Sequence, residues 1–87
     1  MTVKEILRKR DMLVKKNCRV VICDYRTVPN AWLHQINNIE KNGWAVWDGR
    51  KKDIPSEILD RIYACACVIE RNARGKGIEK IAIISVV

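Results

Sequence analysis

The sequence has no apolar stretch long enough to cross a bilayer. Its 87 residues are 48% hydrophobic, but the longest unbroken apolar run falls far short of the roughly 18 residues that a transmembrane helix needs. No apolar segment follows the basic N-terminal residues, so a secretory signal is not expected either. The length fits one domain, residues 1–87, with one modest core. We therefore expect a single small domain that works in the cytoplasm.

The sequence also lacks the motifs of most nucleotide-binding and catalytic sites. Neither phosphate-binding glycine pattern, G-x-x-x-x-G-K-[ST] or G-x-G-x-x-G, occurs. His34 is the only histidine, and its predicted position on a helix surface leaves no catalytic triad. An enzyme is therefore the less expected class.

The four cysteines do not have the spacing of a zinc knuckle. Cys18 and Cys23 are five residues apart, and Cys65 and Cys67 are two apart, all in apolar surroundings. Small buried thiols in a reducing compartment are the simplest interpretation, with a disulfide or a reactive thiol as the alternative. We expect no metal and no cofactor.

Positive charge is in excess and is concentrated near the N-terminus. Seventeen Lys and Arg face ten Asp and Glu, which gives a net charge of +7. Residues 1–19 hold seven of the basic residues and two acids. Such a segment predicts an anionic partner: nucleic acid, a phosphorylated ligand or an acidic protein. The expected partner surface comprises Lys4, Arg8, Lys9, Lys15 and Lys16, unless these side chains only solvate a helix face.

Local signals predict the first half of the chain as helix, strand, helix and strand. Thr2-Val3-Lys4-Glu5 fits a capping box, and a helical apolar period follows as far as Asn17. Residues 19–25 contain an unbroken β-branched run that is typical of a strand covered on both faces. Thr27-Val28-Pro29-Asn30 opens a second helix whose stripe includes Trp32, and Asn42-Gly43 closes it before a short strand at 44–47.

A third helix and a last strand complete the predicted order. Asp53-Ile54-Pro55-Ser56 begins the helix, an apolar stripe runs from Ile58 to Ala73, and Gly75-Lys76-Gly77 ends it. Residues 80–87 form the last strand. The pattern predicts an α/β domain: a small, three-stranded, mainly parallel βαβαβ sheet packed by three helices. It becomes α+β if strand 44–47 is antiparallel. Residues 81–87, as an exposed edge, would also suit self-association into a homo-oligomer.

Parallel pairing would place the loops after the first two strands on one rim, where ligands of such sheets bind. That rim would collect Arg26 and Thr27 from one loop and Arg50, Lys51 and Lys52 from the other. Cations just before helix N-termini predict a bound anion, because free N–H groups face it with them. The alternative is that these side chains only point into water.

Three further residues bear on the chemistry of this rim. Trp47 would be an exposed stacking platform for bases beside the basic loop, unless it is buried in the core. Asp24 and Asp48, at two strand ends, could hold Mg²⁺ for phosphoryl transfer, although aspartate is also a common turn residue.

Three functions therefore remain open. The first is a non-enzymatic module that binds nucleic acid or a phosphorylated ligand. The second is an interaction protein, for instance an inhibitor that covers an acidic surface of a larger nucleic-acid-handling enzyme. The third and least expected is an enzyme that uses Asp24 and Asp48.

Overall fold

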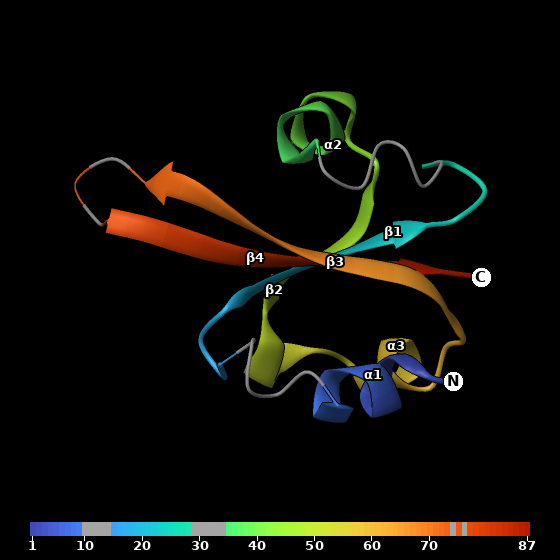
Figure 1. The fold of residues 1–87 in the computed structure, drawn as a ribbon. Helices are drawn as coiled ribbons and strands as arrows, with labels where there is room; N and C mark the ends of the chain where they lie inside the picture. The colour runs from blue at the N-terminus through green and yellow to red at the C-terminus, as the bar shows by residue number, and fades with distance from the viewer. Residues whose placement is uncertain (10–14, 29–34, 74, 76) are drawn as a thin grey trace.

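The fold is a four-stranded sheet with helices on both faces (Figure 1). The computed structural model describes residues 1–9, 15–28, 35–73, 75 and 77–87. The strand order is β2-β1-β4-β3. The strands are β1 (Arg19–Asp24), β2 (Ala45–Arg50), β3 (Tyr63–Ala73) and β4 (Gly77–Val86). Strands β1 and β4 are parallel, whereas β2 pairs with β1 and β3 pairs with β4 in the antiparallel sense.

Short helices cover the two faces unequally. α1 (Val3–Lys9) and α3 (Ser56–Leu59) lie on one face, and α2 (Ile36–Asn42) lies on the other (Figure 1). We call these the α1 face and the α2 face. A 3-10 turn, η2 (Lys51–Asp53), follows β2. Among the described residues, no helix has both the length and the apolar character that a bilayer crossing requires.

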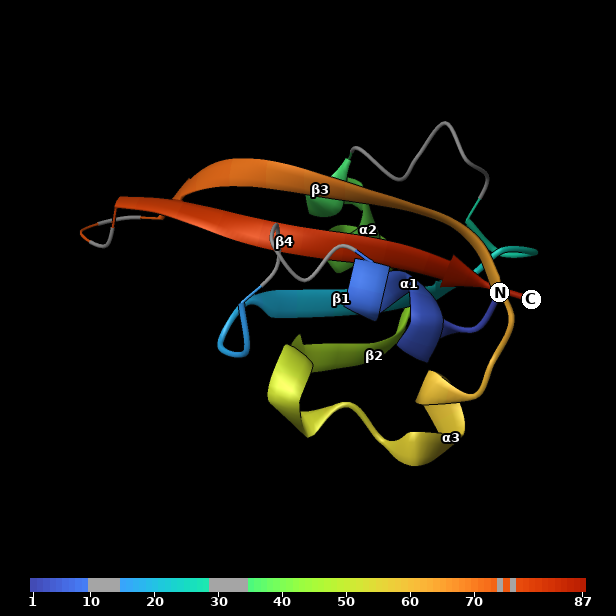
Figure 2. The same ribbon diagram turned by 60° about the horizontal axis from the view of Figure 1, so that its bottom comes forward.

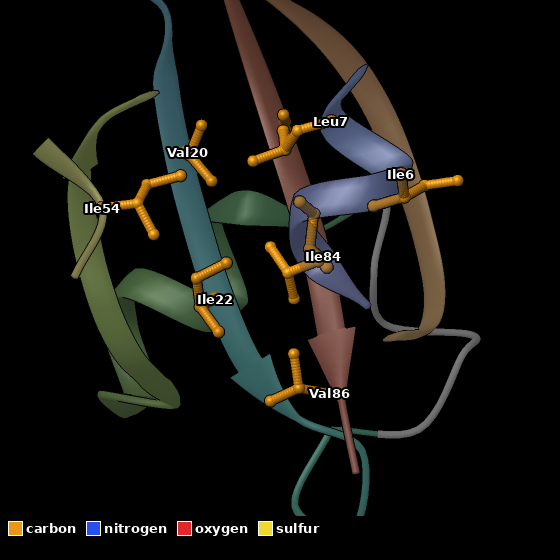
Figure 3. Close-up of a cluster of buried hydrophobic side chains, with 9 residues drawn as sticks. Ile6, Leu7, Val20, Ile22, Ile54, Ile84 and Val86 are labelled. Carbon is orange, nitrogen blue, oxygen red and sulfur yellow. The ribbon is translucent and has the colours of Figure 1, made fainter. Parts of the chain in front are cut away.

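The central pair β1 and β4 supplies both cores. Side chains alternate across a strand, so Val20, Ile22 and Ile84 face the α1 side while Val21 and Ile83 face the α2 side. All of these side chains are buried. Figure 3 shows the α1-face cluster, where residues of α1 meet the two central strands. Burying each such side chain contributes about 1.5–3 kcal/mol, so these two strands hold the domain together.

The N-terminal capping box is confirmed. The Thr2 amide donates to Glu5 Oε1 at 3.1 Å, and the Glu5 amide donates to Thr2 Oγ1 at 3.3 Å. The hydrogen bonds from the Thr2 amide and the Thr2 hydroxyl to the Glu5 carboxylate lower the pKa of Glu5 below its ordinary value. The first helix is present from Val3 to Lys9, and the rest of its predicted length lies outside the described residues.

The second helix and both expected flanking strands are present with shifted bounds. The described helix begins at Ile36, later than the predicted start at Thr27, and ends at Gly43, which adopts the left-handed conformation. Residues 25–28 form a turn, and Trp32 and His34 lie outside the described residues. The strand predicted at 44–47 occupies Ala45–Arg50 and pairs antiparallel with β1. The mainly parallel βαβαβ arrangement is therefore wrong, and the α+β alternative fits better.

The predicted third helix is also wrong over most of its length. Only Ser56–Leu59 is helical, and Tyr63–Ala73 is the longest strand of the sheet. Its apolar run is continuous, so a helical stripe can be drawn through it although alternate residues face opposite sides of a sheet. Gly75 and Gly77, predicted to end a helix, have positive φ; Gly75 lies in the connection from β3 to β4, and Gly77 is the first residue of β4.

The last strand does not lie at an edge of the sheet. β4 is hydrogen-bonded to β1 on one side and to β3 on the other. It therefore cannot provide the edge that residues 81–87 were expected to offer for self-association.

Gly49 gives the Trp47 indole the room it occupies. A Cβ at position 49 would lie 2.8 Å from Trp47 Cζ2. Gly49→Ala should therefore lower the free energy of unfolding by about 1 kcal/mol, because the half-buried ring has to shift. Urea unfolding of the wild type, Gly49→Ala, Trp47→Leu and the double variant tests this. Gly49→Ala should lower the free energy of unfolding much less in the Trp47→Leu background. An equal decrease in both backgrounds would contradict the explanation.

Candidate functional site

The two loops predicted to share a rim lie at opposite ends of the sheet. The turn containing Arg26 and Thr27 follows the end of β1. The segment Arg50–Lys52 lies beside the start of β1, because Arg50 is paired with Arg19 (Figure 2). The reason is the antiparallel sense of β2, which brings the end of one strand next to the beginning of the other. The prediction of one common rim is therefore wrong.

Asp24 and Arg26 form a local turn. Asp24 Oδ1 accepts a hydrogen bond from the Arg26 amide at 2.8 Å. The Asp24 carbonyl accepts from the amides of Thr27 and Val28 at 3.0 and 2.9 Å. This geometry is the one that makes aspartate frequent in turns.

Asp48 does not converge with Asp24. Asp48 lies in the middle of β2, opposite Val21 of β1, and its carboxylate accepts a hydrogen bond from Arg19 Nη2 at 2.6 Å. Within the described ranges, no group of three or more His, Cys, Asp and Glu side chains is placed to hold a metal. The two-carboxylate geometry expected of a magnesium site at a common rim is not formed.

The structure instead joins two basic segments that are far apart in the sequence. The Lys52 amide donates to the Lys16 carbonyl at 3.1 Å, and the Lys51 amide donates to the Cys18 carbonyl at 2.9 Å. Arg50 Nη1 also donates to the Asn17 carbonyl, at 2.7 Å. Backbone bonds therefore hold the turn before β1 against the turn after β2. We call the resulting surface the cationic strip; its residues are Lys15, Lys16, Arg50, Lys51 and Lys52.

Most of the strip is exposed and lacks carboxylate partners. Among the residues that the structure describes, the salt bridges involve Arg19, Arg71 and Lys80, and none involves Lys15, Lys16, Arg50 or Lys52. Those four side chains are exposed. One acid, Asp53, lies in the same turn. The strip therefore keeps a net positive charge toward solvent.

A cavity of about 580 Å³ adjoins the strip. Its lining includes Lys15, Asn17 and Arg50 from the two turns, and Glu79 and Lys80 from β4. At its wall the Cys18 thiol donates to the Lys80 carbonyl at 2.9 Å, and burial raises the pKa of Cys18. The lining carries charges of both signs, so the cavity by itself selects no simple anion.

A separate ionic network fixes α2 to the sheet. Arg19 of β1 bonds Asp48 of β2 and also Glu40 of α2, the latter at 3.2 Å. Arg71 of β3 bonds the other oxygen of Glu40 at 2.7 Å and reaches Glu79 of β4 at 3.5 Å. The Asp48 hydrogen bond is the main cause that raises the pKa of Arg19. These arginines therefore serve the fold and are not free for a ligand.

The remaining predicted site residues divide between the surface and the core. Lys4, Arg8 and Lys9 are exposed on α1. Trp47 is half-buried, packs against the α1-face core and lies over Gly49. The ring is therefore neither the fully exposed stacking platform nor the fully buried core residue that the sequence allows.

The four cysteines are free thiols. Cys23 alone is fully buried, and burial raises its pKa to about 11. Cys18, Cys65 and Cys67 are partly exposed. Burial also raises the pKa of Cys65, partly offset by the Ser85 hydroxyl. The raised pKa values of Cys18, Cys23 and Cys65 fit structural thiols better than activated nucleophiles.

Comparison with known proteins yields no match to a family model, to a curated protein or to a solved structure. The site must therefore be interpreted from its geometry.

The Glu40 network predicts a stability change in acid. Burial of Glu40 raises its pKa, but hydrogen bonds from Arg71 and Arg19 outweigh burial and leave the pKa below its ordinary value. A lowered folded-state pKa stabilises the fold above the unfolded-state pKa, about 4.3, and this contribution is lost as pH falls through the folded-state value. Urea unfolding from pH 7 to pH 3 should show Glu40→Gln less stable than the wild type at neutral pH, with a gap that closes in acid. Glu57→Gln is the matched control, and a gap that is constant with pH would contradict the assignment.

Proposed function

We propose that this protein is a non-enzymatic module that binds nucleic acid through the phosphate backbone, using the cationic strip. One observation supports the proposal above the others: hydrogen bonds hold Lys15–Lys16 and Arg50–Lys52 side by side, although more than 30 residues separate them. One segment carries two cations and the other three, and the fold brings all five onto one surface. Arg26 and Thr27 are not part of this surface, because they follow the end of β1, at the other end of the sheet.

The chemistry of the strip suits phosphates better than bases. Four of its five residues are lysines, whose flexible ammonium groups act as point charges and do not form the planar forks that read base edges. Each neutralised phosphate releases a condensed counterion, so binding would be strongly salt-dependent and largely independent of sequence. The exposed Lys4, Arg8 and Lys9 of α1 would add to the attraction at longer range.

A charge-reversal pair tests the strip directly. Lys16→Glu combined with Lys52→Glu should weaken binding of a fluorescent oligonucleotide at least tenfold at low salt. It should also flatten the dependence of log Kd on log salt concentration, by about 0.7–0.9 per lost phosphate contact. Fluorescence anisotropy at several salt concentrations measures both quantities.

The matched control is Arg26→Glu combined with Lys41→Glu. It makes the same change in net charge, at exposed positions outside the strip. Binding should fall much less in this control. Equal losses of affinity in both double variants would show that only the overall charge matters and would contradict a role of the strip. Wild-type binding that is insensitive to salt would also contradict the proposal. Capture of one stoichiometric acidic protein after nuclease treatment, with no affinity for oligonucleotides, would instead favour the inhibitor function.

A further inference from the structure

The outer edge of β3 is the longest unpaired strand edge in the described part of the chain. β3 runs from Tyr63 to Ala73 and pairs with β4 on one side only. On the other side, Thr2 forms an isolated bridge to Ile62. The Val3 amide donates to the Arg61 carbonyl, and the Tyr63 amide donates to the Met1 carbonyl. The Ile62 carbonyl points the opposite way, to Val87 after β4, so the bridge occupies the outer side.

The bridge just before β3, together with the bond from the Tyr63 amide to Met1, shows that an extended segment pairs with the outer side where β3 begins. It stops at Tyr63, and no described segment pairs with the outer side beyond that residue. The remaining length presents alternating N–H and C=O groups outward, as any edge strand does.

The β3 edge lacks the features that usually prevent edge pairing. Charged side chains, proline and short length are the common protections of an edge. Beyond the occupied positions Ile62 and Tyr63, the six residues 64–69 contain no charge and no proline, and Glu70 and Arg71 follow them. By contrast, the opposite edge strand β2 is six residues long and includes Asp48 and Arg50. The two edges therefore differ in their capacity to add a strand.

The side chains next to the β3 edge are incompletely covered on both faces. Cys65, Cys67 and Ile69 pack against the α2-face core, and Ala66 and Val68 pack against the α1-face core. All five are only partly buried. An added strand would cover apolar surface above and below the sheet as well as satisfying the backbone groups.

We propose that a second copy of this chain pairs with β3 in the antiparallel sense, forming a two-fold dimer with a continuous eight-stranded sheet. Charge does not oppose a second copy at this edge, and the self-complementary register described below favours one. Two molecules of net charge +7 can meet here because residues 62–69 are uncharged. The cationic strip lies in the turn before β1 and at the end of β2 and the turn after it, and β4 separates these two strands from β3. The pairing would leave both strips accessible.

The sequence of β3 specifies one register. A two-fold axis perpendicular to the sheet keeps the same face of both copies on the same side. Because directly opposite residues of an antiparallel pair share a face, the axis must pass midway between one residue and its own copy. An axis at Cys67 would place Arg71 against the occupied edge at Tyr63. An axis at Ile69 would set Val68 opposite Glu70, and one at Glu70 would oppose two carboxylates.

An axis at Val68 pairs residues 64–72 with their copies in reverse order, and only the terminal Ala73 reaches the occupied position at Tyr63. This axis brings neither Arg71 to the occupied edge nor Glu70 opposite Val68 or its own copy. It pairs Val68 with its own copy and Cys67 with Ile69, so the centre is apolar. It also sets Glu70 opposite Ala66 and Arg71 opposite Cys65, where small side chains leave room for long ones. The register is thus complementary in size, and it places no two like charges opposite each other.

The first test is the mass of the unmodified protein in the absence of nucleic acid. Sedimentation equilibrium should give twice the chain mass of 10.1 kDa at micromolar concentration. Hydrogen exchange should show that amides within 64–72 become better protected as the concentration rises. A monomeric mass up to millimolar concentration would overturn the proposal, as would a β3 strand that is protected only by a different protein.

The second test is disulfide trapping across the proposed axis. In a Cys65→Ser, Cys67→Ser background, Val68→Cys should form a covalent dimer under mild oxidation, because directly opposite residues have Cβ atoms about 4.5–5.5 Å apart. Val46→Cys, an exposed position on β2, is the matched control and should stay monomeric, as should the background. Equal cross-linking at both positions would overturn the register. Neither test depends on whether the strip binds nucleic acid.

Discussion

The parallel pairing of β1 with β4 is the constraint on which the rest of the structure depends. The pair joins residues 19–24 to residues 81–86, and their apolar side chains supply both cores. Such strands must be covered above and below. Every other element follows from that demand: α1 and α3 close one face, α2 closes the other, and β2 and β3 complete the sheet on either side.

The candidate site is a consequence of how β2 joins this pair. Because β2 returns antiparallel to β1, its end meets the beginning of β1, and the turns at that end carry lysines and an arginine. The arginines that point onto the α2 face are neutralised by Asp48, Glu40 and Glu79. Among the described residues, no carboxylate forms a salt bridge with Lys15, Lys16, Arg50 or Lys52 of the two turns. The fold thus separates basic residues that stabilise it from basic residues that remain for a partner.

The sequence predicted the parts of this structure that local chemistry decides. The β-branched runs at 19–24 and 81–86 predict buried strands, and both predictions are confirmed. The capping box at Thr2 is confirmed by both of its hydrogen bonds. The segment 63–69 was misjudged because an unbroken apolar run has no period that separates helix from strand. This segment is a strand because it pairs with the side of β4 that β1 leaves open, and no local sequence signal indicates that long-range pairing. The direction of β2 is also decided by tertiary pairing. Because β2 is antiparallel to β1, Arg50 lies at the opposite end of the sheet from Arg26, so the sequence identifies the basic loops but does not show which of them lie together.

The most direct measurement is an amide chemical-shift titration of the isotopically labelled protein with a short single-stranded oligonucleotide at low salt. Binding at the cationic strip should shift the amides of residues 15–18 and 50–52 most, at one end of the sheet, while residues 24–28 at the other end stay nearly unchanged. Shifts centred on 24–28, or the absence of any shift at saturating oligonucleotide, would contradict it.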